Sequence, residues 1–181
     1  ADPEFEDVPT GRLLSKEYAA ERRALIDMNR ALPAASPGRV PSGDTVYLAT
    51  ADAEGNMVSL INSIYSGFGS GICAGDTGVM MQNRGAGFVL DEHHPRRLAP
   101  GKRPFHTIIP GFLMKDGGPL MAFGVVGADM QPQGHIQLLL NHLEFGMNIQ
   151  EAIEAPRVRF VAGNEVWVED RIPPGVAEDL A

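Results

Sequence analysis

Apolar and polar residues alternate in short runs through the middle of the chain, and glycine-rich turns separate these runs. The runs at 46–51 and 57–64 flank an Ala-Glu-Gly-Asn turn at 53–56, which predicts a β-hairpin with Thr45 at its open end. Further strands are expected at 78–82, 106–114 and 120–126, with a chain reversal at 115–118. The alternation therefore indicates short strands over much of the chain.

Two other regions carry the three- and four-residue spacing of a helix. Ser15 offers an N-cap to a helix over about 15 to 30, and one apolar face predicts a second helix at 133–145, which Gly146 would end. A shorter helix is expected at 149–155, and a last hairpin at 158–161 and 165–168. Strands, then helices, then strands favour stacked sheets with outer helices.

Composition and charge narrow the classes of function. The chain has 181 residues, 44% of them hydrophobic, which is enough for one packed domain. Its net charge is −8 and its Lys and Arg residues are scattered, which argues against a nucleic-acid surface. No apolar run approaches the roughly 20 residues of a membrane span. The single cysteine, Cys73, allows no intrachain disulfide and is expected to be a small buried residue.

The segment that ends at Thr45 carries the first candidate chemistry. Proline, alanine, serine and glycine dominate 32–43, which predicts a linker or a cleavable loop that ends at Asp44-Thr45. A Thr freed by cleavage of the preceding bond holds nucleophile and general base in one residue, since its α-amine titrates at roughly pH 8. On this stretch alone, a Thr that simply opens a strand is the commoner meaning.

Downstream of Thr45 come four further stretches in one order, at 52–60, 68–71, 101–104 and 148–157. Together they resemble the γ-glutamyltransferase family (γ-glutamyltranspeptidase or glutathione hydrolase), of the N-terminal-nucleophile hydrolase superfamily. The likeness runs from about Asp2 to the end of the chain. It implies an α+β fold, the four-layer αββα sandwich, and a proenzyme that cuts itself before a Thr. It implies no cofactor and no metal.

The resemblance also implies how the chain is divided and what it binds. Residues 1–44 would be the tail of the large subunit, with a helix and a cleavable linker, and 45–181 the small catalytic subunit, truncated at its C-terminus. The implied partners are that large subunit and a small-molecule amide or γ-glutamyl substrate, with a homodimer of processed heterodimers left open. Any targeting signal would lie upstream of Ala1, so a cytoplasmic or a periplasmic location stays open.

The catalytic residues follow from matching positions. Thr45 matches the nucleophile, with cleavage expected between Asp44 and Thr45, and Ser63 matches a hydroxyl residue that hydrogen-bonds it. Gly127 and Ala128 match the backbone N–H groups that bind the oxyanion, although the family usually has glycine at both positions. Taken alone, Ser63 would be a surface or turn hydroxyl, and Gly127-Ala128 a bend after a strand.

The substrate-binding positions depart from the γ-glutamyl pattern. The family holds the glutamyl α-amine with an Asp and the α-carboxylate with two Ser hydroxyls, where this chain has Gly87 and His106-Thr107. Tyr65 stands where the family commonly has Asn. With Arg84 also nearby, the resemblance implies an acyl group that carries a carboxylate or carbonyl but no ammonium. Taken alone, Arg84 could pair with acidic residues at the surface and His106 could be a core histidine.

Two further patterns bear on the branch of the family and on metals. The stretch at 130–135 resembles a signature shared by cephalosporin-acylase-like proteins, glutathione-hydrolase-like proteins and oxamate amidohydrolase. Its glutamines, Gln131 and Gln133, could simply cap the following helix, with His135 on an exposed face. Adjacent histidines at 93–94 lack the spacing that aims two ligands at one ion, so a solvated loop is expected there.

Two classes of function remain. The leading hypothesis is a self-processing amide hydrolase or acyltransferase that uses Thr45, related to glutathione hydrolase, with oxamate amidohydrolase or a cephalosporin-acylase-like amidase as alternatives. The other class is a non-catalytic scaffold, the remnant of a proenzyme that no longer cleaves. The 181 residues alone are expected not to turn over γ-glutamyl-p-nitroanilide, because most of the large subunit would be missing.

Overall fold

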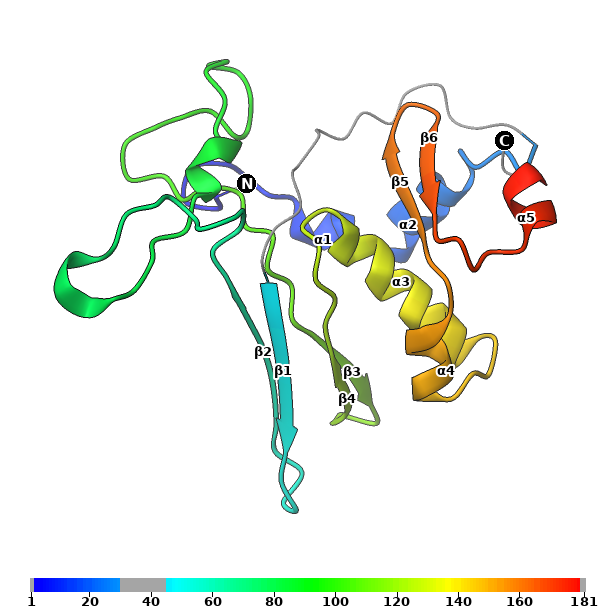
Figure 1. Cartoon of the computed structure of the whole chain (residues 1–181). Coiled ribbons are helices and arrows are strands. Elements are labelled where there is room, and N and C mark those ends of the chain that lie inside the picture. Colours follow the sequence, from blue (N-terminus) through cyan, green and yellow to red (C-terminus); the bar gives the residue numbers. More distant parts are fainter. Residues whose placement is uncertain (1, 30–44, 180–181) are drawn as a thin grey trace. The chain divides into compact units, whose positions relative to one another are not determined.

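The computed structural model describes residues 2–29 and 45–179 of the chain (Figure 1). The described residues form two compact units. The first unit combines 2–29 with 84–106 and 162–165, and the second combines 45–83, 107–161 and 166–179. The predicted linker at 32–43 and Asp44 lie outside the described residues. Each unit thus draws on stretches that are distant in the sequence.

The predicted first hairpin is confirmed. Strand β1 (Thr45–Ala51) pairs antiparallel with β2 (Met57–Ser63), and the register places Thr45 opposite Ser63. The turn forms because the Asp52 carboxylate accepts hydrogen bonds from the backbone N–H groups of Glu54 at 3.1 Å and Asn56 at 2.8 Å. Asp52 therefore stabilises the closed end of the hairpin, and Thr45 lies at its open end.

A second hairpin lies further along the chain. Strand β3 (Gly111–Lys115) pairs antiparallel with β4 (Gly118–Phe123) across a two-residue turn. The turn residues Asp116 and Gly117 both have positive φ, 52° and 83°, as a tight hairpin turn between right-twisted strands requires. The expected strands were longer, because 106–110 and 124–126 are irregular in the structure.

The strand expected at 78–82 was wrong. Met80 makes only an isolated bridge with Cys73. The backbone of Met81 bonds within a loop instead, since its N–H donates to the Ile72 carbonyl at 2.9 Å and its carbonyl accepts from the Ser70 N–H at 2.9 Å. Cys73 itself is exposed, so the expectation of a buried cysteine was also wrong.

The three predicted helices are present with different ends, and two further short helices were not predicted. Helix α2 (Lys16–Arg23) has the predicted Ser15 cap, which accepts from the Tyr18 N–H at 3.1 Å, but it stops well before the expected end. Helix α3 (Met130–Leu143) begins earlier than expected, since Pro132 lies in the first turn, where no N–H is needed. The remaining helices are α1 (Thr10–Leu13), α4 (Ile149–Glu154) and α5 (Pro174–Asp179). Within the described ranges, no helix is long and apolar enough to cross a bilayer.

Two glutamines join helix α3 to the third hairpin, β5 (Val158–Ala162) with β6 (Glu165–Val168). The Gln133 amide accepts from the Phe160 N–H at 2.8 Å and donates to the Phe160 carbonyl at 3.1 Å. Gln137, one helical turn later, does the same with Val158 at 2.9 and 2.8 Å. The two side chains act as a neighbouring strand would, so Gln133 does more than cap its helix.

The inner face of the first hairpin packs against β4. The Tyr47 ring lies so close to Gly124 that a Cβ there would come within 2.3 Å of the ring carbon Cδ2. Ser59 Oγ donates to the Phe123 carbonyl at 3.3 Å and also hydrogen-bonds the Tyr47 hydroxyl at 3.0 Å. These contacts place the chain that leaves β4 beside the start of β1.

Candidate active site

The open end of the first hairpin holds a pair of hydroxyl groups. The hydroxyl of Thr45 donates to Ser63 Oγ at 3.1 Å, because the two residues are directly opposed in the β1–β2 register and share one face. Both side chains are partly buried. Ser63 Oγ also accepts from the Tyr65 N–H at 3.1 Å. The Thr45 hydroxyl is thus held in one direction by an acceptor that the backbone fixes in turn.

Backbone strain lies close to this pair. Three described residues other than glycine have a positive φ: Asp116, Tyr65 and Ala128. Asp116 belongs to a tight turn, but Tyr65 (φ 81°) follows Ser63 by two residues, and Ala128 (φ 52°) lies in the candidate oxyanion loop. Such conformations cost about 1–3 kcal/mol each and concentrate at functional sites.

The candidate oxyanion loop runs from Gly124 to the start of α3. Its end is fixed by two bonds that begin the helix, from the Met130 N–H to the Gly127 carbonyl and from the Gln131 N–H to the Ala128 carbonyl, both 3.0 Å. Ala128 is buried, at 6% exposure. Among the residues that the structure describes, the N–H groups of Gly127 and Ala128 donate to no other group. The loop therefore holds two adjacent donors on a fixed turn.

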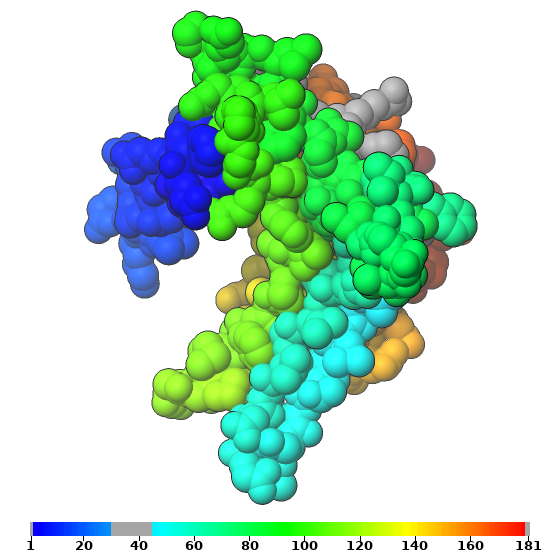
Figure 2. Space-filling model, turned by 90° about the vertical axis from the view of Figure 1, so that its left-hand side faces the viewer, coloured from blue at the N-terminus to red at the C-terminus, as the bar shows by residue number. Residues whose placement is uncertain are grey.

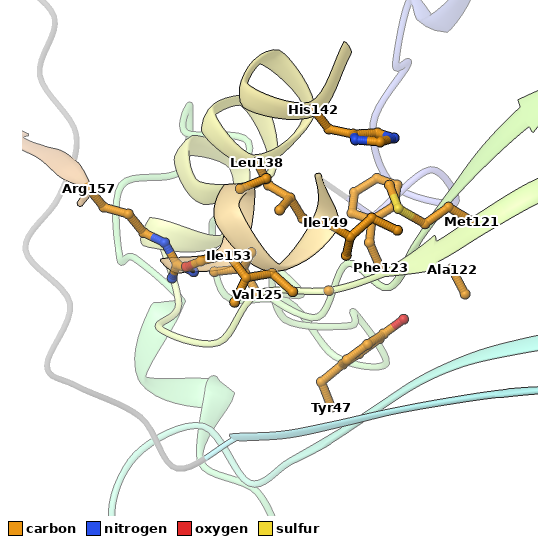
Figure 3. A pocket seen from close by; sticks show the side chains of 12 residues that line it. Tyr47, Met121, Ala122, Phe123, Val125, Leu138, His142, Ile149, Ile153 and Arg157 are labelled. Atoms are coloured by element: carbon orange, nitrogen blue, oxygen red, sulfur yellow. Dashed lines mark hydrogen bonds between the residues drawn. The ribbon is translucent and has the colours of Figure 1, made fainter. Parts of the chain in front are cut away.

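An apolar cavity of about 300 Å³ is lined by Tyr47, which shares one face of β1 with Thr45 (Figure 3). Figure 3 shows the Tyr47 ring on one side of it, with Phe123 and Ile149 across from the ring. The polar groups at its edge already have partners: His142 Nδ1 bonds the Met147 carbonyl at 2.9 Å, and Arg157 donates to the Ile153 carbonyl at 3.2 Å. The cavity thus offers almost only hydrocarbon to anything inside it.

The predicted substrate residues divide between the two units. Tyr65 and Thr107 belong to the unit that holds Thr45, whereas Arg84, Gly87 and His106 belong to the other. A short 3₁₀ helix begins at Arg84 and ends at Gly87. Arg84 is buried, at 3% exposure, so the interpretation of an ion pair at the surface was wrong. Partial burial, and secondly the Arg84 charge, lower the pKa of His106 below its ordinary value.

Two buried polar groups were missed from the sequence. Gln131 is 1% exposed and its Oε1 has no hydrogen-bond partner among the described residues; the same holds for the buried Nε2 of His135. His135 packs edge-on against Phe123, with ring centroids 4.9 Å apart and an interplanar angle of 77°, so the expectation of an exposed face was wrong. Burial lowers the pKa of His135. The predicted helix began only at 133, so Gln131 lay outside it. The four-residue spacing of Gln131 and His135 indicates a shared face only on a helix that starts earlier, as α3 does.

The described residues hold no group of three or more histidine, cysteine and acidic side chains that could bind a metal ion. In the loop at 93–94, His94 Nδ1 accepts from the Arg96 N–H at 2.9 Å, and the His93 N–H donates to the Asp91 carboxylate at 2.9 Å. These hydrogen bonds lie within the loop and fix its conformation.

Comparison with known proteins identifies the class. The sequence profile of the γ-glutamyltranspeptidase family matches residues 1–181, so the chain belongs to that family. The crystal structure of cephalosporin acylase from Bacillus halodurans is similar with a TM-score of 0.87 and 49% sequence identity, over 99% of this chain and 32% of that chain. The mixed fold of helices and strands is therefore the fold of this family.

Particular relatives can be named. The chain is 46% identical over 156 residues to the glutathione hydrolase-like YwrD proenzyme of Bacillus subtilis, which covers 86% of this chain and 29% of the relative. It is 42% identical over 156 residues to the oxamate amidohydrolase proenzyme of Klebsiella pneumoniae, again over 86% and 29% of the two sequences. The chain spans about a third of the length of the curated relatives that it matches.

Proposed function

We propose that Thr45 is the nucleophile of a self-processing amide hydrolase or acyltransferase. The observation that carries this proposal is the hydrogen bond from the Thr45 hydroxyl to Ser63 Oγ at 3.1 Å, at the first residue of β1. It aims the hydroxyl and leaves the oxygen lone pairs of Thr45 for attack. Membership of a family whose relatives are named proenzymes supports the same conclusion.

The self-cleavage step needs no outside reagent except water. The Thr45 oxygen attacks the carbonyl carbon of Asp44, the bond from that carbon to the Thr45 nitrogen breaks, and the nitrogen gains the hydroxyl proton. The product is an ester between the two residues. Water then hydrolyses the ester, which releases the Asp44 carboxylate and restores the Thr45 hydroxyl beside a free α-amine.

Turnover repeats the same chemistry on a substrate amide. The Thr45 hydroxyl attacks the carbonyl carbon, and its proton passes through the α-amine to the leaving amine. The negative oxygen of the tetrahedral intermediate is stabilised by the N–H groups of Gly127 and Ala128, two adjacent residues just before helix α3. The resulting acyl-enzyme is released by water, which gives hydrolysis, or by an acceptor amine, which gives transfer.

The proposed acyl group carries a carboxylate or carbonyl and no ammonium. Gly87 supplies no side chain with which to bind an α-amine. The guanidinium of Arg84 is buried and contributes, after burial itself, to the lowered pKa of His106, and a guanidinium suits a carboxylate better than an ammonium. Tyr65 and Thr107 stay predictions from the sequence, since they belong to the other compact unit. The likeness to an oxamate amidohydrolase proenzyme agrees with a small carboxylate-bearing substrate.

We propose the four-layer αββα sandwich as the fold of the whole protein. The outer face of the β1–β2 hairpin supports it, because this face carries Val46, Leu48, Val58 and Leu60, which are 48–66% exposed. A second sheet packed on that face would bury these side chains. In this proposal 1–44 is the tail of a large subunit and 45–181 part of the small one, and the processed pair can form a homodimer.

The test is the intact mass of the full-length protein after incubation. We expect two chains, the smaller beginning at Thr45, and a single uncut chain for Thr45→Ala. The matched control is Thr50→Ala, which removes an exposed hydroxyl from the same strand and should leave cleavage unchanged. A single chain in wild type and both variants would contradict the proposal and favour the non-catalytic scaffold.

The acyl preference is tested with two substrates that differ at one carbon. Glutaryl-p-nitroanilide and γ-glutamyl-p-nitroanilide share the reacting amide and the terminal carboxylate, but only the second has the α-ammonium. We expect the processed full-length protein to favour the glutaryl compound in kcat/KM, and Gly87→Asp to shift the ratio towards the γ-glutamyl compound. A preference for the γ-glutamyl substrate in wild type would contradict the proposed pocket, while leaving Thr45 as nucleophile.

A further inference from the structure

A buried carboxylate near the N-terminus is bound by a residue about a hundred positions later. The Asp2 side chain is only 1% exposed, and Arg103 supplies three bonds to it. Its backbone N–H and Nε donate to Oδ2 at 2.9 and 3.2 Å, and its Nη2 donates to Oδ1 at 2.8 Å. The guanidinium binds both carboxylate oxygens in the planar, two-point geometry that makes such pairs strong.

A second ion pair lies beside the first. Lys102, whose side chain is 1% exposed, donates from Nζ to Glu6 Oε1 and to the Pro95 carbonyl, both at 3.0 Å. Arg97 bonds the same Glu6 oxygen. The Lys102 ammonium also lies 5.5 Å from the centre of the Phe5 ring. The aromatic face and the carboxylate of the N-terminal segment thus cover a lysine that would otherwise be a buried, unpaired charge.

We name this set the N-terminal clasp. It consists of the acidic side chains of Asp2 and Glu6 in the segment 2–6, and the basic side chains of Arg97, Lys102 and Arg103 in the loop 97–103. All five belong to the same compact unit. Figure 2 shows the dark blue N-terminal residues against the green segment that contains 97–103. The clasp lowers the pKa of both carboxyl groups, so both are charged at neutral pH.

In the sequence, the acidic segment of the clasp precedes the bond before Thr45, and the basic loop follows it. We propose that the N-terminal clasp holds the two chains of the processed protein together, with the acidic segment at 2–6 as the partner of the basic loop at 97–103. The inference rests on the proposed self-cleavage. Cleavage changes the clasp from an intrachain to an interchain contact. Release of one chain would remove the charged partners of Asp2 and Lys102 and leave these side chains with water alone.

The test separates the clasp from self-cleavage. A site-specific protease sequence is inserted between Pro37 and Gly38 of the full-length Thr45→Ala protein, so that the protease makes the cut. Release of the N-terminal chain is then followed by size exclusion in a urea series. We expect Asp2→Asn and Arg103→Gln each to raise the ratio of released to retained N-terminal chain roughly tenfold at a fixed urea concentration near the midpoint, and the double variant to add little.

The matched control is Arg171→Gln, which breaks an ion pair with Glu169 that lies wholly after Thr45. It should leave the chains joined as in the parent protein. Far-UV circular dichroism of the uncut variants shows whether each still folds. Wild-type retention in both clasp variants, or effects of Asp2→Asn and Arg103→Gln that add in full, would overturn the clasp. Because a protease supplies the cut, absence of self-cleavage would overturn only the proposed function.

Discussion

The two faces of the β1–β2 hairpin differ in a way that ordinary hydrophobic patterning does not anticipate. The inner face, which packs against β4, carries four hydroxyl groups, on Thr45, Tyr47, Ser59 and Ser63. The outer face carries Val46, Leu48, Val58 and Leu60, and all four are about half exposed or more. A hairpin that lay on a core by itself would show the reverse arrangement.

This difference suggests separate roles: we propose that the inner face takes part in the reaction and that the outer face packs against another part of the protein. On the inner face each hydroxyl has a partner, and the contacts with Phe123 and Gly124 join the hairpin to the candidate oxyanion loop. On the outer face nothing in the described residues covers the apolar side chains to the extent expected for a core. We therefore expect substitutions on the outer face to affect stability, and those at the Thr45–Ser63 end of the inner face to affect reaction rate as well.

The largest expected effect tests the outer face. In the full-length protein, Leu60→Asp should lower the free energy of unfolding by about 3 kcal/mol or more, because a carboxylate would replace a side chain that the proposed second sheet buries. Urea unfolding measures it. Thr50→Asp, on the same face but next to the polar turn, is the control and should cost much less. Equal, small effects of both changes would show that nothing packs on this face.

The next effect tests the contact between the hairpin and β4. In Gly124→Ala the added Cβ would lie 2.3 Å from Cδ2 of Tyr47, closer than two non-bonded carbons can approach, so the ring must shift and we expect a loss of about 2 kcal/mol from overpacking. Gly85→Ala is the matched control, since no atom lies within 4 Å of its added Cβ and its φ is not positive. Urea midpoints that fall equally for both variants would contradict the close packing of Tyr47 on Gly124.

Two serines on the inner face sharpen the comparison further. Ser63→Ala removes the acceptor of the Thr45 hydroxyl, and we expect self-cleavage to slow about tenfold. Ser59→Ala removes bonds to Tyr47 and Phe123 and should cost about 1 kcal/mol of stability without a comparable change in rate. Intact-mass time courses and urea unfolding measure the two quantities. A slower cleavage in Ser59→Ala than in Ser63→Ala would reverse the assignment.

The fold was predictable where local signals decide it. The turn at 53–56, the Ser15 cap and the chain reversal at 115–118 each fix an element through local hydrogen bonds or torsions, and all three are confirmed. The strand expected at 78–82 was wrong because apolar alternation does not supply a partner strand; the backbone of Met81 bonds to a loop instead. Long-range pairing therefore limits what the pattern can show.

The site was predictable only in part. Register opposes Thr45 and Ser63, so a hairpin with the right turn already brings the two hydroxyls together. Nothing local indicates that Gln133 and Gln137 would bond the edge of β5, since these bonds join residues more than 20 positions apart. The burial of Gln131 and Arg84 was missed for the same reason: polar residues are usually exposed, and tertiary packing decides the exceptions.

A smaller effect is expected from Ala128 in the candidate oxyanion loop. Ala128 has a φ of 52°, a region that costs alanine about 1 kcal/mol and glycine almost nothing. Ala128→Gly keeps the N–H donor and should raise stability by less than about 1 kcal/mol, since glycine also gains entropy in the unfolded chain. The rate of self-cleavage should change little. A marked loss of rate together with unchanged stability would show that the methyl group of Ala128 itself positions the loop.

The smallest expected effect concerns His135, behind the inner face. Its pKa is lowered by burial in the folded protein, so below roughly pH 6.5 the unfolded chain binds a proton that the folded one does not. The free energy of unfolding therefore falls as pH drops from 7, and the part due to His135 stops falling below the pKa of the folded state.

The variant His135→Phe keeps a ring against Phe123 and removes the titrating imidazole. Urea unfolding at pH 7 and pH 5.5 should show a weaker pH dependence, by up to about one proton, with the part due to His106 retained. An unchanged pH dependence would mean that His135 is protonated in the folded state, which requires an acceptor or water at its buried Nε2.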